Sequence, residues 1–381
     1  MTPFGRFPGR GIRAMAVAAI DEALADAGIP AEDIDRIFFG NVVAGIVEQQ
    51  EMIRGQVALR HHPLGGTTLV NVENACASGG SALNLAYEAI AGGREEVVLA
   101  VGAEQLNHED RARPFNALRA STDIEEIGGW TPADTASKSI LMDYYAGVAQ
   151  RYLDEYDAKA EDFARVAVKN RHNAGYNALA HFREPQTIED VMGSRMIADP
   201  LRLAMCAPTT DGAAALVLCS EEYGRRLKRK SVHLVTSHIA SKPGPDRGPV
   251  GPAAQAAYEA SGIGPDSFDL IELHDAAAPA ELLQYAEIGL CKEGEAHHLV
   301  RDGRTELGGA MPVNTSGGLL SRGHPLGATG CAQVVELCVQ MRGEAGRRQV
   351  GNAQVGLAIN GGGWLQGTYA LAVATIVKRI D

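Results

Sequence analysis

Two stretches of this chain resemble one another, and this internal repeat limits the possible folds more than any other feature of the sequence. Residues 27–41 and 261–275 each read as a helix end with a glycine cap, a short acidic turn and an apolar strand. The aligned positions are Gly28 with Gly262, Asp35 with Asp269 and Ile37 with Ile271. Two similar α/β halves explain both this order and the length of 381 residues. A chance resemblance of two generic α/β units is the alternative.

The similarity extends to a loop that opens a helix in each half. In the first half, a loop with Cys76 opens a helix, and an apolar strand over 97–102 follows. In the second half, a loop with His324 opens a helix, and a strand over 355–359 follows. A pseudo-twofold relation between the halves would bring the Cys76 helix close to the His324 loop.

These patterns predict an N-terminal half over residues 1–225 and a C-terminal half over residues 226–381. An insertion rich in helix-pattern sequence interrupts the first half over residues 107–202, approximately. Such an insertion on an α/β core often supplies a substrate groove. Its basic side chains either bind phosphates or belong to a solvated helix face, which is the commoner case. They are Lys169, Arg171, Arg183 and Arg195.

The repeat also indicates that the first half lacks one strand. The second half opens with an apolar strand over 232–239, and its counterpart in the first half would lie before Met1. Either the reading frame starts late or the first sheet has one strand fewer. We expect the missing strand to be a central one, whose loss would expose unpaired backbone groups and apolar surface.

Charge and composition exclude several classes of protein. The net charge of −12 argues against a general nucleic-acid binder, which needs a basic face. No apolar run approaches the roughly 18 residues of a membrane helix, and the first residues do not read as a signal peptide. The six cysteines form no C-x-x-C pair and match no zinc pattern. We therefore expect a reduced cytoplasmic protein that binds neither a metal ion nor a membrane.

Cys76 lies where a short apolar strand meets a helix that begins with a run of small residues. At a helix N-terminus the dipole and the unpaired N–H groups favour the thiolate over the thiol. This placement suits a nucleophile. The commoner role of a single cysteine in an apolar stretch is that of a buried structural residue.

The segment 314–330 is the most specific in the chain. Glycines on both sides of His324 let the backbone approach a ligand closely, and Pro325 restricts the turn that follows. We therefore expect a functional histidine here, with Ser316 and Gly318 of the same segment contacting the substrate. A phosphate-binding loop is excluded because the chain has no G-x-x-x-x-G-K-[ST] sequence, and a G-x-S-x-G nucleophile motif is also absent.

Four motifs, taken together, resemble the thiolase superfamily in order, spacing and residue type. They are residues 74–79, 211–215, 274–276 and 323–330. The His274-Asp275 pair is similar to the sterol-carrier-protein-x branch of that superfamily, and so is the segment 200–203, which precedes Asp211 in the sequence. The resemblance spans nearly the whole chain.

The resemblance implies a five-layer αβαβα fold with a helical loop-domain insertion, and a homodimeric core. It also implies acyl-CoA chemistry, with coenzyme A as a substrate and no tightly bound cofactor. In that chemistry Cys76 takes the acyl group as a thioester, and His324 accepts the thiol proton and helps to bind the thioester oxygen. His274 would complete one oxyanion site, and Gly361 and Gly362 would line the second together with the Cys76 N–H.

The chain departs from the superfamily pattern at the second cysteine. Most thiolases carry it in a C-x-G motif near the C-terminus, where this chain has Ile359. In the sterol-carrier branch a cysteine and then a phenylalanine usually follow the His-Asp pair, and here both are alanine, Ala276 and Ala277. The proton transfer at the α-carbon therefore lacks its expected residue. Three small side chains at 276–278 also suggest room for a bulky or aromatic substrate.

Three functions remain open at this point. The first is a thiolase that cleaves or forms a bulky or aromatic 3-oxoacyl-CoA, in a degradation similar to β-oxidation, with His274, His324 or a water in place of the second cysteine. The second is an acyltransferase that passes the Cys76-bound acyl group to another acceptor. The third is a subunit that works only with a small zinc-ribbon/OB-fold partner, which would also cover the surface left by the missing strand.

Overall fold

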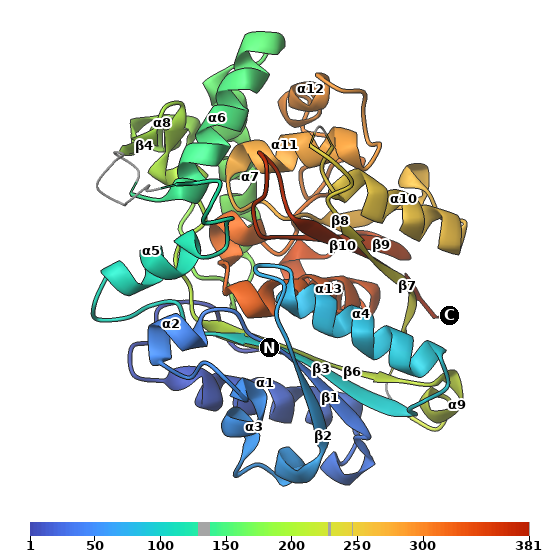
Figure 1. The fold of residues 1–381 in the computed structure, drawn as a ribbon. Coiled ribbons are helices and arrows are strands. Elements are labelled where there is room, and N and C mark those ends of the chain that lie inside the picture. The colour runs from blue at the N-terminus through green and yellow to red at the C-terminus, as the bar shows by residue number, and fades with distance from the viewer. Residues whose placement is uncertain (129–137, 228–229, 246, 381) are drawn as a thin grey trace.

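The computed structural model describes residues 1–128, 138–227, 230–245 and 247–380. Two four-stranded sheets form its centre, with the orders β2-β1-β3-β6 and β7-β10-β9-β8 (Figure 1). The strands of the first sheet are β1 (Arg36–Gly40), β2 (Thr68–Val72), β3 (Val97–Glu104) and β6 (Gly212–Cys219). Those of the second are β7 (Val232–Ser241), β8 (Leu270–Glu272), β9 (Val355–Gly362) and β10 (Leu371–Arg379).

Three strands of each sheet share one arrangement, β1, β3 and β6 in the first and β8, β9 and β10 in the second. β1 runs parallel to β3 and β8 runs parallel to β9, whereas β6 and β10 run antiparallel to β3 and β9. All eight residues of β3 are buried, as expected for a strand that has helices on both faces.

Helices and sheets alternate in five layers (Figure 1). The middle layer consists of α4 (Ser78–Ala91) and α13 (Thr329–Met341), which contact each other and strands of both sheets. α1 (Gly11–Ala27), α2 (Ala44–Glu48) and α3 (Arg54–Leu59) lie on the side of the first sheet, where α1 packs on β3 and β6. α10 (Val250–Ser261) and α11 (Ala278–Glu287) lie on the side of the second sheet, where α10 packs on β7 and β10. The predicted five-layer αβαβα fold is confirmed.

The aligned residues of the internal repeat adopt the same local structure in both halves. Gly28 ends α1 at φ 67° and Gly262 ends α10 at φ 68°, a left-handed conformation that glycine adopts without steric cost. Asp35 accepts hydrogen bonds from the N–H groups of Glu96 and Val97, at the start of β3. Asp269 does the same for Gln354 and Val355, at the start of β9. The repeat is therefore structural and not a chance resemblance.

A counterpart of β7 would lie at the edge of the first sheet, so the expectation of a central position for that strand is wrong. β7 lies at the edge of the second sheet beside β10, and β6 is the counterpart of β10. Only the start of β6 has a partner on its outer side among the described residues, where the N–H of Thr2 donates to Ala213 O and Gly5 pairs with Asp211. A groove of about 1130 Å³ runs beside the rest of β6. Because an edge strand supports only one neighbour, the other pairings of the sheet are complete without it.

The insertion forms a helical layer over the ends of the sheets. It contains α5 (Ala112–Arg119), α6 (Ile140–Glu155), α7 (Ala160–Gly175), α8 (Ile188–Gly193) and a hairpin of β4 (Met196–Ala198) and β5 (Leu201–Arg202). The remaining helices are α9 (Glu221–Gly224) and α12 (Ala296–Arg301). None of the helices in the described ranges is long and apolar enough to span a membrane.

Two of the four basic residues of the insertion are not available to a phosphate group. Lys169 is buried in an ion pair with Glu281 at 2.8 Å, and the buried Arg171 guanidinium lies over the ring of Phe182 at 4.6 Å. Arg183 and Arg195 are exposed. Burial of a charge requires a partner, so Lys169 and Arg171 serve the packing of α7.

Glycines allow the two central helices to approach closely, and this contact generates a stability prediction. A Cβ on Gly330 of α13 would overlap the backbone nitrogen of Gly80 in α4, and neither group can move without shifting a helix. We expect Gly330→Ala to lower the free energy of unfolding by about 1–3 kcal/mol, the usual cost of overpacking. Gly351→Ala is the matched control, because nothing lies within 4 Å of a Cβ there. Equal urea midpoints for the two variants would contradict this account.

Candidate active site

Cys76 lies in the short connection between β2 and α4, two residues before the helix begins at Ser78. The preceding residue, Ala75, has φ 46°, in the left-handed region that non-glycine residues rarely adopt. Cys76 itself is buried, with 9% of its surface exposed. Backbone strain of this kind persists where the surrounding structure imposes it, often at functional sites.

His324 lies in a glycine-rich loop whose hydrogen bonds determine the tautomer of its ring. Its Nδ1 lies 2.7 Å from the Oγ1 of Thr329, and this hydroxyl donates its own proton to Pro325 O. On this ground we assign the ring proton to Nδ1, which leaves Nε2 with a free lone pair. Nε2 is buried and has no hydrogen-bond partner among the described residues. Such a nitrogen is suited to accept a proton.

His274 follows β8 and has the opposite tautomer. The Nδ2 of Asn360 lies 3.1 Å from His274 Nδ1 and also donates to Cys76 O, while the N–H of Gly80 donates to Asn360 Oδ1. These contacts set the orientation of the Asn360 amide, so His274 Nδ1 accepts a hydrogen bond and Nε2 carries the proton. Gln284 holds the backbone of His274 at both its N–H and its carbonyl. His274 is thus a positioned hydrogen-bond donor.

The three predicted residues meet at one point. The Sγ of Cys76 and one nitrogen of each of His274 and His324 lie within 4.8 Å of one another, and the two rings are perpendicular, at 87° with centroids 5.0 Å apart. A thiol and two imidazole rings therefore converge. The same donor set has the composition of a zinc site, but zinc would hold Cys76 as its ligand and block acylation. The expectation of a metal-free site stays a prediction.

The site is neutral at rest, and the expected lowering of the thiol pKa is wrong. Burial, and after it the nearby Glu104 carboxylate, raises the pKa of Cys76 to about 12. Burial lowers the pKa of His274 to about 3, with help from the charge of Arg322, and lowers the pKa of His324 well below its usual value. Removal of water from the thiolate outweighs the field of the α4 N-terminus.

A small cavity of about 70 Å³ adjoins these residues. Its walls include the predicted Gly361 and Gly362, together with Ala276, and Cys76 is the only cysteine among the lining residues. A Cβ on Gly362 would overlap Asn74 O, so only glycine lets β9 approach the Cys76 loop this closely. The predicted Gly361 and Gly362 therefore lie beside Cys76, and their role in an oxyanion site stays a prediction.

Ser316 and Gly318 do not line this cavity, contrary to expectation. Ser316 is fully buried, and its Oγ donates to Glu272 at 2.6 Å and accepts from Arg322 at 3.1 Å. Gly318 has φ 57°, and a Cβ there would overlap the carboxylate of Asp275. Ser316 thus links the buried Arg322 to the buried Glu272, which need each other as partners, and Gly318 lets the chain pass close to Asp275. Both residues stabilise the turn that leads to His324.

Sequence reasoning missed several residues that shape the site. Thr329 and Asn360 set the two imidazole tautomers, and the side chains of Tyr145, Trp364 and Tyr369 form one wall of the cavity. Asn360 lies within the Ile359-Asn360-Gly361 segment that marked the missing cysteine, so its place near the site was visible. Nothing in the sequence indicated its contact with His274.

The chain belongs to the thiolase family. The model of the thiolase N-terminal domain matches residues 1–222, and that of the thiolase C-terminal domain-like family matches residues 232–375. Together with the fold, these matches define a thiolase-family acyltransferase, which is an enzyme.

The relatives are similar over most of the chain. An acetyl-CoA acetyltransferase of Methanothermobacter thermautotrophicus is 38% identical over 95% of this chain and 94% of its own length. The benzoylsuccinyl-CoA thiolase subunit BbsB of Thauera aromatica is 37% identical over 87% of this chain and 86% of its own. Sterol carrier protein 2 of Bos taurus is 36% identical over 91% of this chain, which spans 65% of that longer protein. Among solved structures, the Ltp2–ChsH2(DUF35) aldolase matches with a TM-score of 0.79 and 28% identity, over 99% of this chain and 95% of the other.

The tautomer of His324 provides a test at Thr329. Thr329→Val removes the acceptor for the Nδ1 proton, so the ring loses its preference for a free Nε2. We expect kcat of acyl transfer to fall by about 10–100-fold, as for other residues that orient a catalytic imidazole, and Thr329→Ser to restore most of it. If the valine variant retained the wild-type kcat, the tautomer assignment would be wrong.

The raised thiol pKa provides a second test. A thiol with a pKa of about 12 is less ionised at pH 7–9 than a free cysteine, whose pKa is about 8.5. We therefore expect the alkylation rate of Cys76 by iodoacetamide to climb steadily between about pH 6 and 10 without a plateau. Mass spectrometry of the Cys76 peptide measures this rate. A plateau below about pH 8 would show a thiolate at rest instead.

Proposed function

We propose that this enzyme catalyses CoA-dependent cleavage, or the reverse Claisen-type formation, of a 3-oxoacyl-CoA with a bulky or aromatic acyl group, through a thioester on Cys76. The observation that carries the proposal is the convergence of the Cys76 thiol with one ring nitrogen of His274 and one of His324. We assign His324 as the proton acceptor and His274 as the hydrogen-bond donor from the partners of their Nδ1 atoms. Covalent catalysis by a thiol needs such a base beside it, and the developing oxyanion needs a preorganised donor.

In the first half-reaction, His324 Nε2 accepts the thiol proton while Cys76 Sγ attacks the 3-oxo carbon of the substrate. The bond between C2 and C3 then breaks, C3 remains on Cys76 as a thioester, and C2 takes the bonding electron pair and a proton to leave as acetyl-CoA. In the second half-reaction, the thiol of CoA loses its proton to a base and attacks the thioester. The Cys76 thiol is then regenerated.

Charge forms on the substrate oxygen only during attack. The neutral resting site fits this sequence, because no buried thiolate or imidazolium has to be maintained before the substrate arrives. His274 Nε2–H and the backbone of Gly361 and Gly362 supply the donors that stabilise the oxyanion. With no second cysteine lining the cavity, we assign the proton transfer at C2 to His274, His324 or a water.

We further propose a heteromeric enzyme around a homodimeric core. The relative BbsB is named as a subunit, and the similar aldolase structure pairs Ltp2 with ChsH2(DUF35). These relatives support a partner protein for this chain as well, and the resemblance to the sterol-carrier branch suggests a small zinc-ribbon/OB-fold protein in that role. A homodimer is supported by β2, an edge strand with Val70 39% exposed, since two such edges could pair across a twofold axis.

The alternative is an acyltransferase that passes the Cys76-bound acyl group to another acceptor. It shares the thioester but not the thiolysis of a 3-oxoacyl-CoA. Substrates with and without the 3-oxo group distinguish the two, because only cleavage of the 3-oxoacyl-CoA releases acetyl-CoA.

The central experiment tests Cys76 directly. Cys76→Ala should abolish both the thioester adduct and acetyl-CoA release from a panel of short, long and aromatic 3-oxoacyl-CoAs, assayed with and without candidate partners. Cys291→Ala is the control, since that partly buried thiol lies outside the cavity. Wild-type turnover by the Cys76→Ala variant would refute the proposal.

A further inference from the structure

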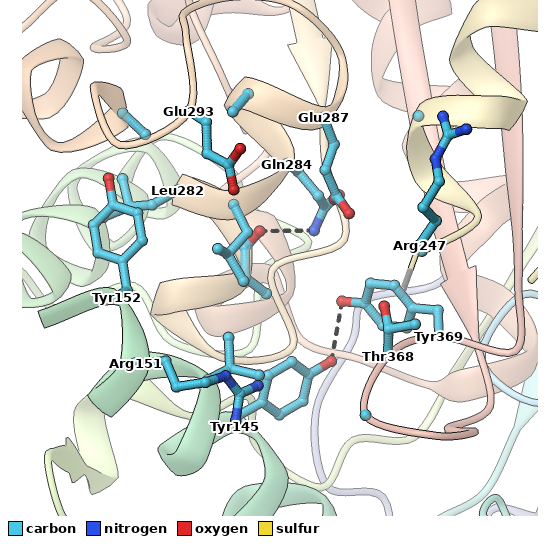
Figure 2. Close-up of a pocket in the computed structure, with 18 of the residues that line it drawn as sticks. Tyr145, Arg151, Tyr152, Arg247, Leu282, Gln284, Glu287, Glu293, Thr368 and Tyr369 are labelled. Atoms are coloured by element: carbon cyan, nitrogen blue, oxygen red, sulfur yellow. Dashed lines mark hydrogen bonds between the residues drawn. The ribbon is translucent and has the colours of Figure 1, made fainter. Parts of the chain in front are cut away.

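A second and much larger pocket lies directly behind the aromatic wall of the catalytic cavity (Figure 2). It measures about 610 Å³ and lies between α6, α11 and the loops before α10 and before β10. Tyr145, Trp364 and Tyr369 line both this pocket and the cavity at Cys76. The two spaces are therefore separated by the thickness of one layer of side chains.

The shared wall is held by few polar contacts. The hydroxyl of Tyr145 donates to that of Tyr369 at 3.0 Å, and the hydroxyl of Tyr369 donates to His274 O (Figure 2 shows the first). Trp364 is 5% exposed, and its indole N–H has no hydrogen-bond partner among the described residues. A buried donor without an acceptor is costly, so the closed wall gains no polar contact from Trp364.

The lining favours an aromatic occupant. Five of the 25 lining residues are aromatic, whereas aromatic residues make up 5% of the chain. They are Tyr145, Tyr152, Tyr156, Trp364 and Tyr369. Trp364 already makes an edge contact with Tyr145 at 5.1 Å and a stacked contact with Tyr144 at the same distance. A further ring can add to such a cluster by stacking or edge contact.

The charges around the pocket argue against an anionic acyl group. Two arginines and three glutamates line it: Arg151, Arg247, Glu155, Glu287 and Glu293. Burial raises the pKa of Glu287 to about 7, so the positive and negative charges nearly balance, and a carboxylate on the substrate would find no strong net attraction there. An uncharged ring fits the part of the lining formed by Tyr145, Trp364 and Tyr369, next to the catalytic cavity.

We propose that this pocket binds the aryl end of an aroyl group whose carbonyl carbon is attached to Cys76, with Tyr145 and Trp364 as the residues that select for the ring. The inference rests on the function proposed above and gives that function a substrate class, the 3-aryl-3-oxoacyl-CoAs. Separation of the Tyr145 and Tyr369 hydroxyls joins the two spaces.

The test fills the pocket from opposite walls without touching the catalytic cavity. Val148→Trp on α6 and Leu283→Trp on α11 each place an indole in the large pocket, and neither residue lines the cavity at Cys76. Gln150→Trp adds the same side chain to an exposed position of α6 outside both spaces. The readout is the rate of Cys76 acylation, measured by mass spectrometry with 3-oxo-3-phenylpropanoyl-CoA and with acetoacetyl-CoA.

We expect both filled variants to lose about tenfold or more in acylation by the phenyl substrate, while acetoacetyl-CoA changes by less than about threefold and Gln150→Trp changes neither. Equal losses for both substrates, or no loss for the phenyl substrate, would overturn the pocket assignment. Failure of wild type with both substrates would instead overturn the proposed function. Wild type could also accept the phenyl substrate and not acetoacetyl-CoA. In that case, loss of acylation by the phenyl substrate in both filled variants supports the proposal, provided that their unfolding midpoints match that of Gln150→Trp.

Discussion

The contact between the two halves at the central helices is the constraint on which the rest of the structure depends. α4 and α13 can lie against each other only because small residues face one another there, and Gly80 and Gly330 leave no room for a side chain. At the same point the Asn360 amide accepts from Gly80 and donates to the Cys76 carbonyl. One polar side chain of the second half thus ties the backbone of the nucleophile to the contact that joins the halves.

That contact explains why the side chains of the site have fixed orientations and why they are uncharged at rest. Cys76 comes from the first half, and His274 and His324 come from the second, so close packing of the halves excludes water from all three. Burial then raises the pKa of the thiol and lowers the pKa values of both histidines. Nδ1–H of His324 donates to Thr329 Oγ1, whereas Nδ1 of His274 accepts from the Asn360 amide, so Nε2 is an acceptor in His324 and a donor in His274. Charge separation is therefore deferred to the moment of attack.

Much of the fold was predictable from the repeat, because the aligned residues act locally. Gly28 and Gly262 end helices, and Asp35 and Asp269 hydrogen bond to the first N–H groups of β3 and β9. The meeting of Cys76 with His324 followed from the pseudo-twofold relation, and His274 from the resemblance to thiolases. Ser316 and Gly318 were misplaced because a glycine-rich loop looks the same whether it faces a ligand or the carboxylates of Glu272 and Asp275. The position expected for the counterpart of β7 was wrong because the order of strands along the chain does not determine their order within a sheet.

The sequence by itself determined the two-half architecture, the family and the three candidate site residues Cys76, His274 and His324, since these depend on periodicity, local capping and motifs of neighbouring residues. Only the tertiary structure decided the protonation of the site, because a pKa depends on how much water and which charges surround a group. It also decided the tautomers of His274 and His324 and the large pocket behind Tyr145, Trp364 and Tyr369. Each of these arises from residues that are far apart in the chain and become neighbours only when the halves and the insertion pack together.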